Sequence, residues 1–175
     1  PLDHVAAHYN TDRRWIVLMG FSMGGAGCWH IGAHYADRFV AMSPGAGFAE
    51  TAQYQNLKPE DVPWYERKLW GVYDVPCYTR NLFNLPVVAY SGEKDKQIQA
   101  ARVMEEAFSG EGEELPHLIG PGMGHKYHPD TLREILKRMK QSHDHGLDTN
   151  PDKVTLQTHT LRYHKMHWVD VQGLE

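Results

Sequence analysis

The stretch that most constrains this chain is a short apolar run that ends in a Gly-x-Ser-x-Gly motif. Trp15 to Met19 is an apolar segment of the kind that forms a buried strand. The motif Gly-Phe-Ser-Met-Gly follows directly at residues 20–24, and the small residues after it predict a helix from Gly24 to Phe39. A strand, a tight turn that carries a serine, and a helix together form a nucleophile elbow. The pattern therefore predicts that Ser22 is a nucleophile lifted clear of a sheet.

The chemistry of such a turn accounts for the residue types around the serine. A side chain in place of Gly20 or Gly24 is expected to collide with the neighbouring strand and helix. Gly25 and Gly27 are expected to let the helix and the strand pack closely. The amide N–H of Met23 is expected to point to the place where an oxyanion would form. The N-terminus of the helix adds partial positive charge nearby.

Length and composition exclude several classes of function. The chain has 175 residues, which suits one domain with a sizeable core, and its net charge of -4 gives no sign of nucleic-acid binding. No apolar run is long enough to predict a span across a membrane. The two cysteines, Cys28 and Cys77, form neither a disulfide framework nor a metal motif. We expect Cys28 to be a small packed residue of the motif helix.

Strand and helix patterns alternate after the motif. Further strands are predicted at Phe39–Met42, Leu85–Ser91 and Leu115–Ile119, and helices at Gln97–Phe108 and Pro129–Ser142. Strands that alternate with helices indicate an α/β fold with a parallel sheet. We therefore expect residues 1–145 to form this domain.

Two segments do not fit the alternation. Residues 48–84 hold eight of the nineteen aromatic residues and form either connecting helices or a lid over the serine. We expect Phe21, together with Trp64 and Trp70 of this segment, to bind substrate. Residues 146–175 are predicted to be a polar linker and a β-hairpin, with strands in Val154–Tyr163 and Met166–Val171, which could begin an appended β-domain.

A serine hydroxyl needs a base, and the base needs a carboxylate that orients it. In this fold class the acid and then the histidine follow the serine, each on a loop after a strand. Asp95, after the third predicted strand, is the candidate acid, with Glu93 and then Asp74 as alternatives. His125, in a loop rich in glycine, is the candidate base.

The remaining histidines are weaker candidates for a role in the chemistry. His128 immediately precedes a helix and His117 lies inside a strand, so neither suits the base as well as His125 does. His30 and His34 have the spacing of a zinc pair on a helix, but residue 31 is not a glutamate and no third ligand is evident. We therefore expect no metal site.

With these residues in place, the chain resembles the α/β-hydrolases. It is most similar to their prolyl-oligopeptidase-like and esterase branch, which includes polyhydroxybutyrate-depolymerase and feruloyl-esterase type enzymes. The resemblance covers about residues 3–140. It is carried by residues 11–14 leading into 20–25, Tyr35–Phe39, Ser43–Gly45, Gly92–Asp95 and Gly124–His125.

The resemblance implies a mechanism and a substrate class. Ser22, Asp95 and His125 would be nucleophile, acid and base, acting through an acyl-enzyme intermediate on a small or polymeric ester without a cofactor. A serine peptidase of the prolyl-oligopeptidase type would use the same triad, and an acyltransferase would replace water by another alcohol. A non-catalytic fragment that keeps the hydrolase scaffold is the alternative from a different class.

One departure from the family pattern lies at the start of the chain. The family places several strands and helices before the elbow, whereas 21 residues precede Ser22 here. We therefore expect this chain to correspond to the C-terminal half of the domain, without the loop that supplies a second oxyanion donor. Trp15–Met19 would then be an apolar edge strand. Such an edge predicts homo-oligomers, pairing with a separate N-terminal fragment, or poor solubility.

Overall fold

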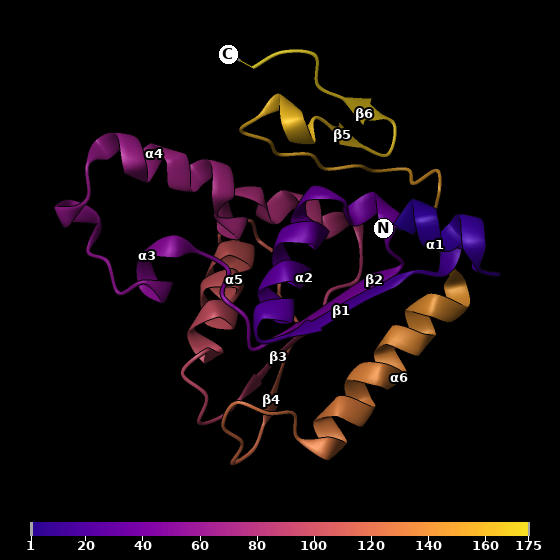
Figure 1. Ribbon diagram of the computed structural model, residues 1–175, viewed down its shortest axis with the longest axis horizontal. Coiled ribbons are helices and arrows are strands. Elements are labelled where there is room, and N and C mark those ends of the chain that lie inside the picture. The colour runs from indigo at the N-terminus through magenta and orange to yellow at the C-terminus, as the bar shows by residue number, and fades with distance from the viewer. Residues whose placement is uncertain (1, 175) are drawn as a thin grey trace.

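The computed structural model describes residues 2–174 and contains a four-stranded parallel sheet (Figure 1). Its strands are β1 (Val17–Phe21), β2 (Ala41–Gly45), β3 (Ala89–Gly92) and β4 (His117–Gly120). They lie in the spatial order β1-β2-β3-β4 and every neighbouring pair is parallel. The predicted α/β fold with a parallel sheet is confirmed, and β1 is an edge strand of the sheet formed by the described residues.

Helices connect the strands and cover both faces of the sheet. The α-helices are α1 (Leu2–His8), α2 (Met23–His34), α3 (Thr51–Tyr54), α4 (Trp64–Tyr73), α5 (Ile98–Gly110) and α6 (Pro129–His145). Shorter 3₁₀ segments are η1 (Arg13–Trp15), η2 (Ala36–Arg38), η3 (Pro59–Asp61), η4 (Val75–Asn84) and η5 (Leu161–Tyr163). Among the described helices, none is long and apolar enough to cross a membrane.

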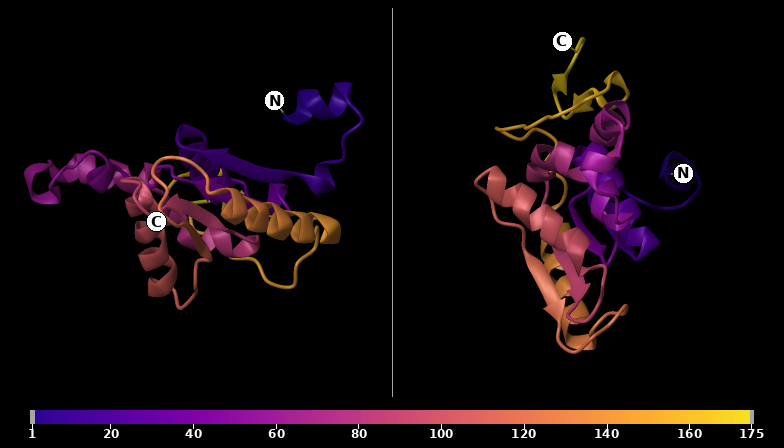
Figure 2. Two further views of the ribbon diagram at one scale, coloured as in Figure 1. Left: turned by 90° about the horizontal axis from the view of Figure 1, so that it is seen from below. Right: turned by 90° about the vertical axis from the view of Figure 1, so that its left-hand side faces the viewer.

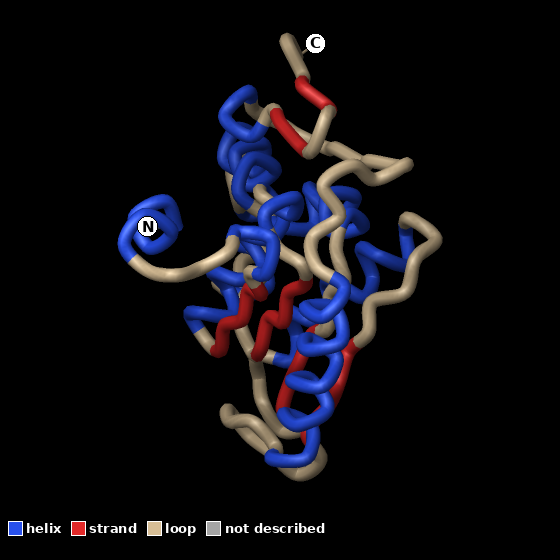
Figure 3. The backbone as a smooth tube through the Cα atoms, turned by 90° about the vertical axis from the view of Figure 1, so that its right-hand side faces the viewer, coloured by secondary structure: helices blue, strands red, loops and turns tan. Residues whose placement is uncertain are grey.

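The side chains of β2 alternate between two hydrophobic clusters, as expected for a sheet covered on both faces. Met42 packs with α2, η4 and α5, in a cluster that includes Trp29, Leu82 and Met104. Ala41 points to the other face, where α6 packs in a second cluster. Figure 2 shows α6 running along its own side of the sheet. Helix α1 buries no residue and lies beside this layered body (Figure 3).

The strands begin later than the apolar runs that predict them. Trp15, expected in the first strand, lies instead in η1, which is capped by the side chain of Asp12 accepting from the Arg14 amide. The helix after the motif ends at His34, and η2 rather than helix continues the chain toward Phe39. Phe39 is buried as an apolar run suggests, but Trp15 is exposed and no residue of β1 is buried, so the expectation of a buried strand at Trp15–Met19 is wrong on burial. Pairing with β2 determines where the strand starts.

The aromatic segment divides into two parts with different exposure. Helix α4 buries none of its residues, whereas η4 buries Val75, Tyr78 and Leu82 under α2 and α5. Residues of η4 therefore behave as connecting structure packed on the core. Helix α4 extends from that core at the periphery of the molecule (Figure 1).

The C-terminal residues lie across α2 and η4 in an extended course (Figure 1). Two asparagines of η4, Asn81 and Asn84, each bond the backbone N–H and the backbone carbonyl of one residue in this C-terminal segment. The Asn81 amide donates to the carbonyl of Gln157 at 2.9 Å and accepts from its N–H at 2.6 Å. Asn84 pairs with Thr155 in the same way, at 2.7 and 3.0 Å.

A small hairpin follows this extended course. It forms only over β5 (Lys165–Met166) and β6 (Val169–Asp170), so the strand predicted over Val154–Tyr163 is wrong. In residues 154–163 the backbone bonds the side-chain amides of Asn81 and Asn84 instead of a neighbouring strand. Met166 is fully buried in the main core cluster, which ties the hairpin to the domain.

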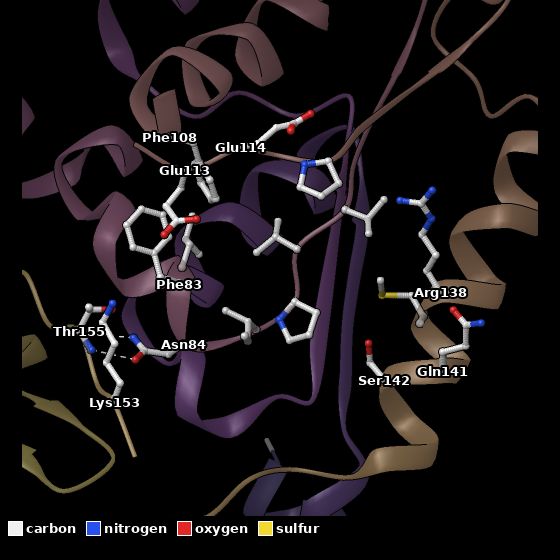
Figure 4. A pocket seen from close by; sticks show the side chains of 17 residues that line it. Phe83, Asn84, Phe108, Glu113, Glu114, Arg138, Gln141, Ser142, Lys153 and Thr155 are labelled. Carbon is white, nitrogen blue, oxygen red and sulfur yellow. Dashed lines mark hydrogen bonds between the residues drawn. The ribbon is translucent and has the colours of Figure 1, made fainter. Parts of the chain in front are cut away.

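A cavity of about 540 Å³ lies at the amino ends of the strands, between α6 and residues 153–155 (Figure 4). Its walls include Phe83 and Asn84, just before β3, and Glu113 and Glu114, just before β4. Ligands of open parallel sheets bind at the opposite, carboxyl ends of the strands. The cavity is therefore separate from the site that carries the predicted catalytic residues.

Candidate active site

Ser22 lies at the junction of β1 and α2 with a backbone conformation that non-glycine residues rarely adopt. Its φ and ψ are 57° and −121°. The Ser22 N–H donates to the carbonyl of Gly45 on β2 at 2.8 Å, and the Ser22 carbonyl accepts from Ala26 N–H at 3.0 Å. These bonds from strand and helix hold the strained turn in place. The predicted strand–turn–helix arrangement around Ser22 is what the structure contains.

Two glycines permit this close approach of strand and helix. A Cβ atom at Gly20 would collide with the carbonyl of Gly24, and one at Gly25 would collide with the carbonyl of Gly45. The expectation for Gly24 and Gly27 is wrong, because a Cβ atom at either would meet no atom within 4 Å. Both point away from the sheet, since the helix turns them outward after Ser22.

The three residues predicted as nucleophile, base and acid form one chain of hydrogen bonds. His125 Nε2 lies 2.8 Å from Ser22 Oγ, and His125 Nδ1 lies 2.8 Å from Asp95 Oδ2. Asp95 follows β3 and His125 follows β4, so the carboxyl ends of the parallel strands bring both to Ser22. With the proton on Nδ1, Nε2 can accept the proton of the serine hydroxyl.

The carboxylate of Asp95 is buried and its second oxygen is also occupied. Its side chain is 5% exposed, whereas that of His125 is 44% exposed. Asp95 Oδ1 accepts a hydrogen bond of 3.0 Å from the Gln97 N–H, just before α5. The acid is thus fixed from one side, and the imidazole is reachable from solvent.

The loops that carry Asp95 and His125 are joined directly. Glu93 N–H donates to Gly120 O at 3.0 Å and Lys94 N–H donates to Met123 O at 2.8 Å. The Glu93 carboxylate accepts from Gly122 N–H at 2.5 Å. Glu93, the alternative acid, therefore bonds the backbone of the loop that carries His125 and does not bond the imidazole of His125.

Tyr90 of β3 supports the same loop from below. Its hydroxyl donates to the carbonyl of Lys126 and accepts from the N–H of His128, both at 2.8 Å. The side chain is fully buried, and burial raises the pKa of its hydroxyl. Sequence reasoning missed this residue, because nothing in a tyrosine inside a strand shows that its hydroxyl reaches a loop 36 residues further along.

An open cleft of about 390 Å³ surrounds the serine and is lined by Ser22, Lys94, Asp95, Lys96, Gln97 and His125. The predicted substrate-binding residues Phe21, Trp64 and Trp70 are not among these. The Phe21 ring packs against the His125 ring, with ring centres 4.9 Å apart, and Trp64 and Trp70 lie on α4. Met23 is exposed, and as the first residue of α2 its N–H has no carbonyl within the helix to bond.

The other histidines occupy separate environments. His117 bonds Glu105 on α5, and His128 precedes α6. His30 packs between Phe48 and Tyr73. Burial lowers the pKa of His30 and, more strongly, that of His34, to about 4.

Two further placements bear on the sequence expectations. The thiol of Cys28 is buried as predicted, and burial raises its pKa to about 12. The described residues contain no cluster of three or more histidine, cysteine or acidic side chains suited to a metal ion.

Asp74, the third candidate acid, accepts from the Thr51 hydroxyl at 2.6 Å, away from His125.

A parallel sheet, a strained serine between strand and helix, and an acid and a histidine at the ends of the next strands define the α/β-hydrolase class. The chain belongs to the family described as "Putative esterase", whose model matches residues 2–130. It has no match among curated protein sequences.

Solved structures of hydrolases share the fold at low sequence identity. A puromycin-hydrolyzing peptidase from Mycobacterium tuberculosis has a TM-score of 0.64 and 14% identity, over 87% of this chain and 25% of that chain. A ferulic acid esterase has a TM-score of 0.62 and 17% identity, over 81% and 58%. An S-formylglutathione hydrolase from Staphylococcus aureus has a TM-score of 0.57 and 17% identity, over 81% and 57%. This chain spans 21% to 58% of the lengths of such structures.

Proposed function

We propose that this chain carries the catalytic residues of a serine hydrolase that cleaves carboxylic esters. The observation that supports the proposal most is the hydrogen-bond chain from Ser22 through His125 to Asp95, with both links at 2.8 Å. Membership in an esterase family agrees with it. The three side chains come from separate loops, and a structural role alone would not require them to meet at an open cleft.

The first half of the reaction forms an acyl-enzyme. His125 Nε2 takes the proton of the Ser22 hydroxyl as Oγ attacks the ester carbonyl, and the carbonyl oxygen becomes an oxyanion. The Met23 N–H and the N-terminus of α2 stabilise that charge. His125 then gives its proton to the leaving alkoxide, the C–O bond breaks, and the alcohol departs. Asp95 keeps the imidazole in the required tautomer and stabilises its charged form.

The second half returns the enzyme to its starting state. A water molecule loses a proton to His125 Nε2 and attacks the acyl carbon. The new tetrahedral intermediate collapses, Ser22 Oγ regains the proton from His125, and the carboxylic acid leaves. The exposed side of the imidazole supports this step, because water can reach Nε2 from the cleft.

The test is labelling by a fluorophosphonate together with turnover of 4-nitrophenyl butyrate. We expect both for the parent chain and for the control Ser109→Ala, which changes an exposed serine at the end of α5. Ser22→Ala should abolish both. Labelling that persists in Ser22→Ala would contradict the proposal by placing the reactive nucleophile elsewhere. A parent chain without labelling or turnover would contradict it too, and would favour a non-catalytic scaffold.

A serine peptidase is the second candidate, because the same triad would serve it and a peptidase is among the structures of similar fold. The discriminating pair is a 4-nitrophenyl ester and a 4-nitroanilide with the same acyl group. Preference for the ester supports esterase function. Comparable kcat/KM on the anilide supports a peptidase.

A further inference from the structure

Two lysines flank the buried acid in the cleft around Ser22. Lys94 and Lys96 stand on either side of Asp95, and both line the cleft with their side chains exposed. No ion pair connects either ammonium group to any residue between 2 and 174. Both charges are therefore available to a molecule in the cleft.

The two acidic residues next to these lysines in the chain are already engaged. Asp95 is buried and bonds both His125 and the Gln97 amide. Glu93 directs its carboxylate to the Gly122 N–H. The N-terminus of α2 at Ser22 and that of α5, which begins after Gln97, add positive potential at the same place. The cleft is thus cationic in a chain whose net charge is -4.

The position of Lys94 is fixed by its backbone. Its N–H bonds the carbonyl of Met123 in the loop that carries His125, at 2.8 Å. Its flexible side chain therefore starts from a point that is held against the catalytic loop. The other residues that line the cleft beside Asp95 are Ser22, Gln97 and His125, and each carries a polar group.

We infer that this cleft takes esters that carry an anionic group, such as a carboxylate, within a few bonds of the scissile carbonyl, held by Lys94 and Lys96. The inference rests on the proposed esterase function and names its substrate class. Two exposed lysines with flexible side chains each contribute a modest Coulomb attraction. Together they give a preference for the anionic ester of about fivefold to tenfold in kcat/KM.

The experiment compares matched esters that differ in one charge. The anionic acyl ester is 4-nitrophenyl hydrogen adipate and its neutral partner is 4-nitrophenyl methyl adipate. A second pair, 4-carboxyphenyl butyrate and 4-carbamoylphenyl butyrate, places the charge on the leaving group instead. The pair with the larger charge preference identifies the side of the ester that meets the lysines.

Variants connect the preference to the two lysines. The double variant Lys94→Gln/Lys96→Gln should bring the anionic-to-neutral ratio of kcat/KM close to one. Lys94→Arg/Lys96→Arg should keep most of the ratio. Lys137→Gln, an exposed lysine on α6, is the control and should leave it unchanged. About 0.5 M NaCl should reduce the ratio in the parent chain, because the charges are exposed.

Binding of adipate, compared with neutral adipamide and followed by NMR shifts of the His125 ring, provides a readout without turnover. Equal kcat/KM within both ester pairs overturns the inference and leaves the esterase proposal standing. A chain that turns over no ester contradicts the esterase proposal. The charge inference is then supported if adipate binds more tightly than adipamide and the double variant loses that difference, and it is overturned if the two bind alike.

Discussion

The Tyr90 hydroxyl donates a hydrogen bond of 2.8 Å to the carbonyl of Lys126, the residue that follows the candidate base in the chain. The same hydroxyl accepts from His128 N–H at 2.8 Å. A side chain of the sheet core therefore fixes the loop on the far side of His125. The base is held from two directions, because the Asp95 loop bonds the near side of the same loop.

Replacing this hydroxyl should misplace the base. Tyr90→Phe leaves two backbone groups without their buried partner, which costs about 1–3 kcal/mol of unfolding free energy. We expect kcat on 4-nitrophenyl butyrate to fall several-fold with KM little changed, because His125 moves with its loop while the other residues that line the cleft stay in place. Steady-state kinetics and urea denaturation measure the two effects. The control is Tyr127→Phe, which changes a neighbouring tyrosine whose ring centre lies 4.5 Å from that of Tyr90. An equal loss of kcat in both variants would contradict the positioning role of the Tyr90 hydroxyl.

Asp95 and Glu93 are two residues apart, but we expect their replacement to lower kcat by very different factors. Asp95→Asn favours the wrong imidazole tautomer and should lower kcat by on the order of 10³–10⁴. Glu93→Gln keeps a hydrogen-bond acceptor for Gly122 N–H and should lower kcat by less than about tenfold. The measurement is kcat at saturating 4-nitrophenyl butyrate. A larger loss in Glu93→Gln would reassign the acid.

The C-terminal segment should stabilise the domain through Asn81. This side chain is 1% exposed and makes hydrogen bonds to Ala33 and to both backbone groups of Gln157. Asn81→Ala should lower the unfolding free energy by about 3 kcal/mol, measured by urea denaturation. Asn150→Ala, in the exposed turn before the segment, should change it by less than about 0.5 kcal/mol. Equal stabilities would show that the segment is not docked in solution.

The stability of the chain should fall in mild acid because of His34. Burial is the main reason that its pKa is about 4, below the ordinary 6.5, and the charge of His30 adds to it. Between these values the unfolded chain binds the proton and the folded chain does not, so stability is lost as the pH falls from about 6.5 to 4. The loss reaches up to about 3 kcal/mol.

Replacement of His34 isolates this contribution from that of His30. His34→Phe keeps an aromatic ring against Tyr163, whose ring stacks on His34 at 3.6 Å. Urea denaturation at pH 4.5 and pH 7.5 should show a smaller difference in the variant than in the parent chain. Identical differences would rule out His34 as a source of acid sensitivity.

Among the described residues β1 has a partner on one side only, and we propose that its other side pairs with a second copy of this chain. The Ile16 carbonyl and the Ser22 N–H both bond the β2 side, so the backbone groups of Val17, Met19 and Phe21 face the open edge. Met19→Pro removes an N–H from that edge without breaking the β1–β2 ladder. Sedimentation equilibrium should show association in the parent chain and less in the variant.

The control for the edge is Leu18→Pro, which removes an N–H that faces β2 and should instead unfold the sheet. A parent chain that sediments as a monomer at all concentrations tested would contradict pairing through β1. Retained association in Met19→Pro would place the contact elsewhere.

The sequence was sufficient to predict that Ser22, Asp95 and His125 meet, because their order and their positions in loops after strands follow from the architecture. Their catalytic roles stay a prediction. Tyr90 and the bonds between the two loops could not be predicted, since they join backbone groups that any residue possesses. Gly24 shows a related limit, because its motif position did not reveal that its α-carbon points outward. The positions of Trp64 and Trp70 could not be predicted, because an aromatic residue in the sequence does not show whether its helix packs on the core. Helix α4, which carries both, buries no residue, whereas the following segment η4 packs on the core.

The pairing of Asn81 and Asn84 with the C-terminal segment constrains that segment in an unusual way. The asparagines bond only the backbone of residues 155 and 157, and the Thr155 hydroxyl adds one side-chain bond, of 2.6 Å to the carbonyl of Arg80. The pairing with the asparagines therefore depends on the spacing of the two residues more than on the identity of their side chains. A one-residue deletion between these positions would be more damaging than exchange of both residues.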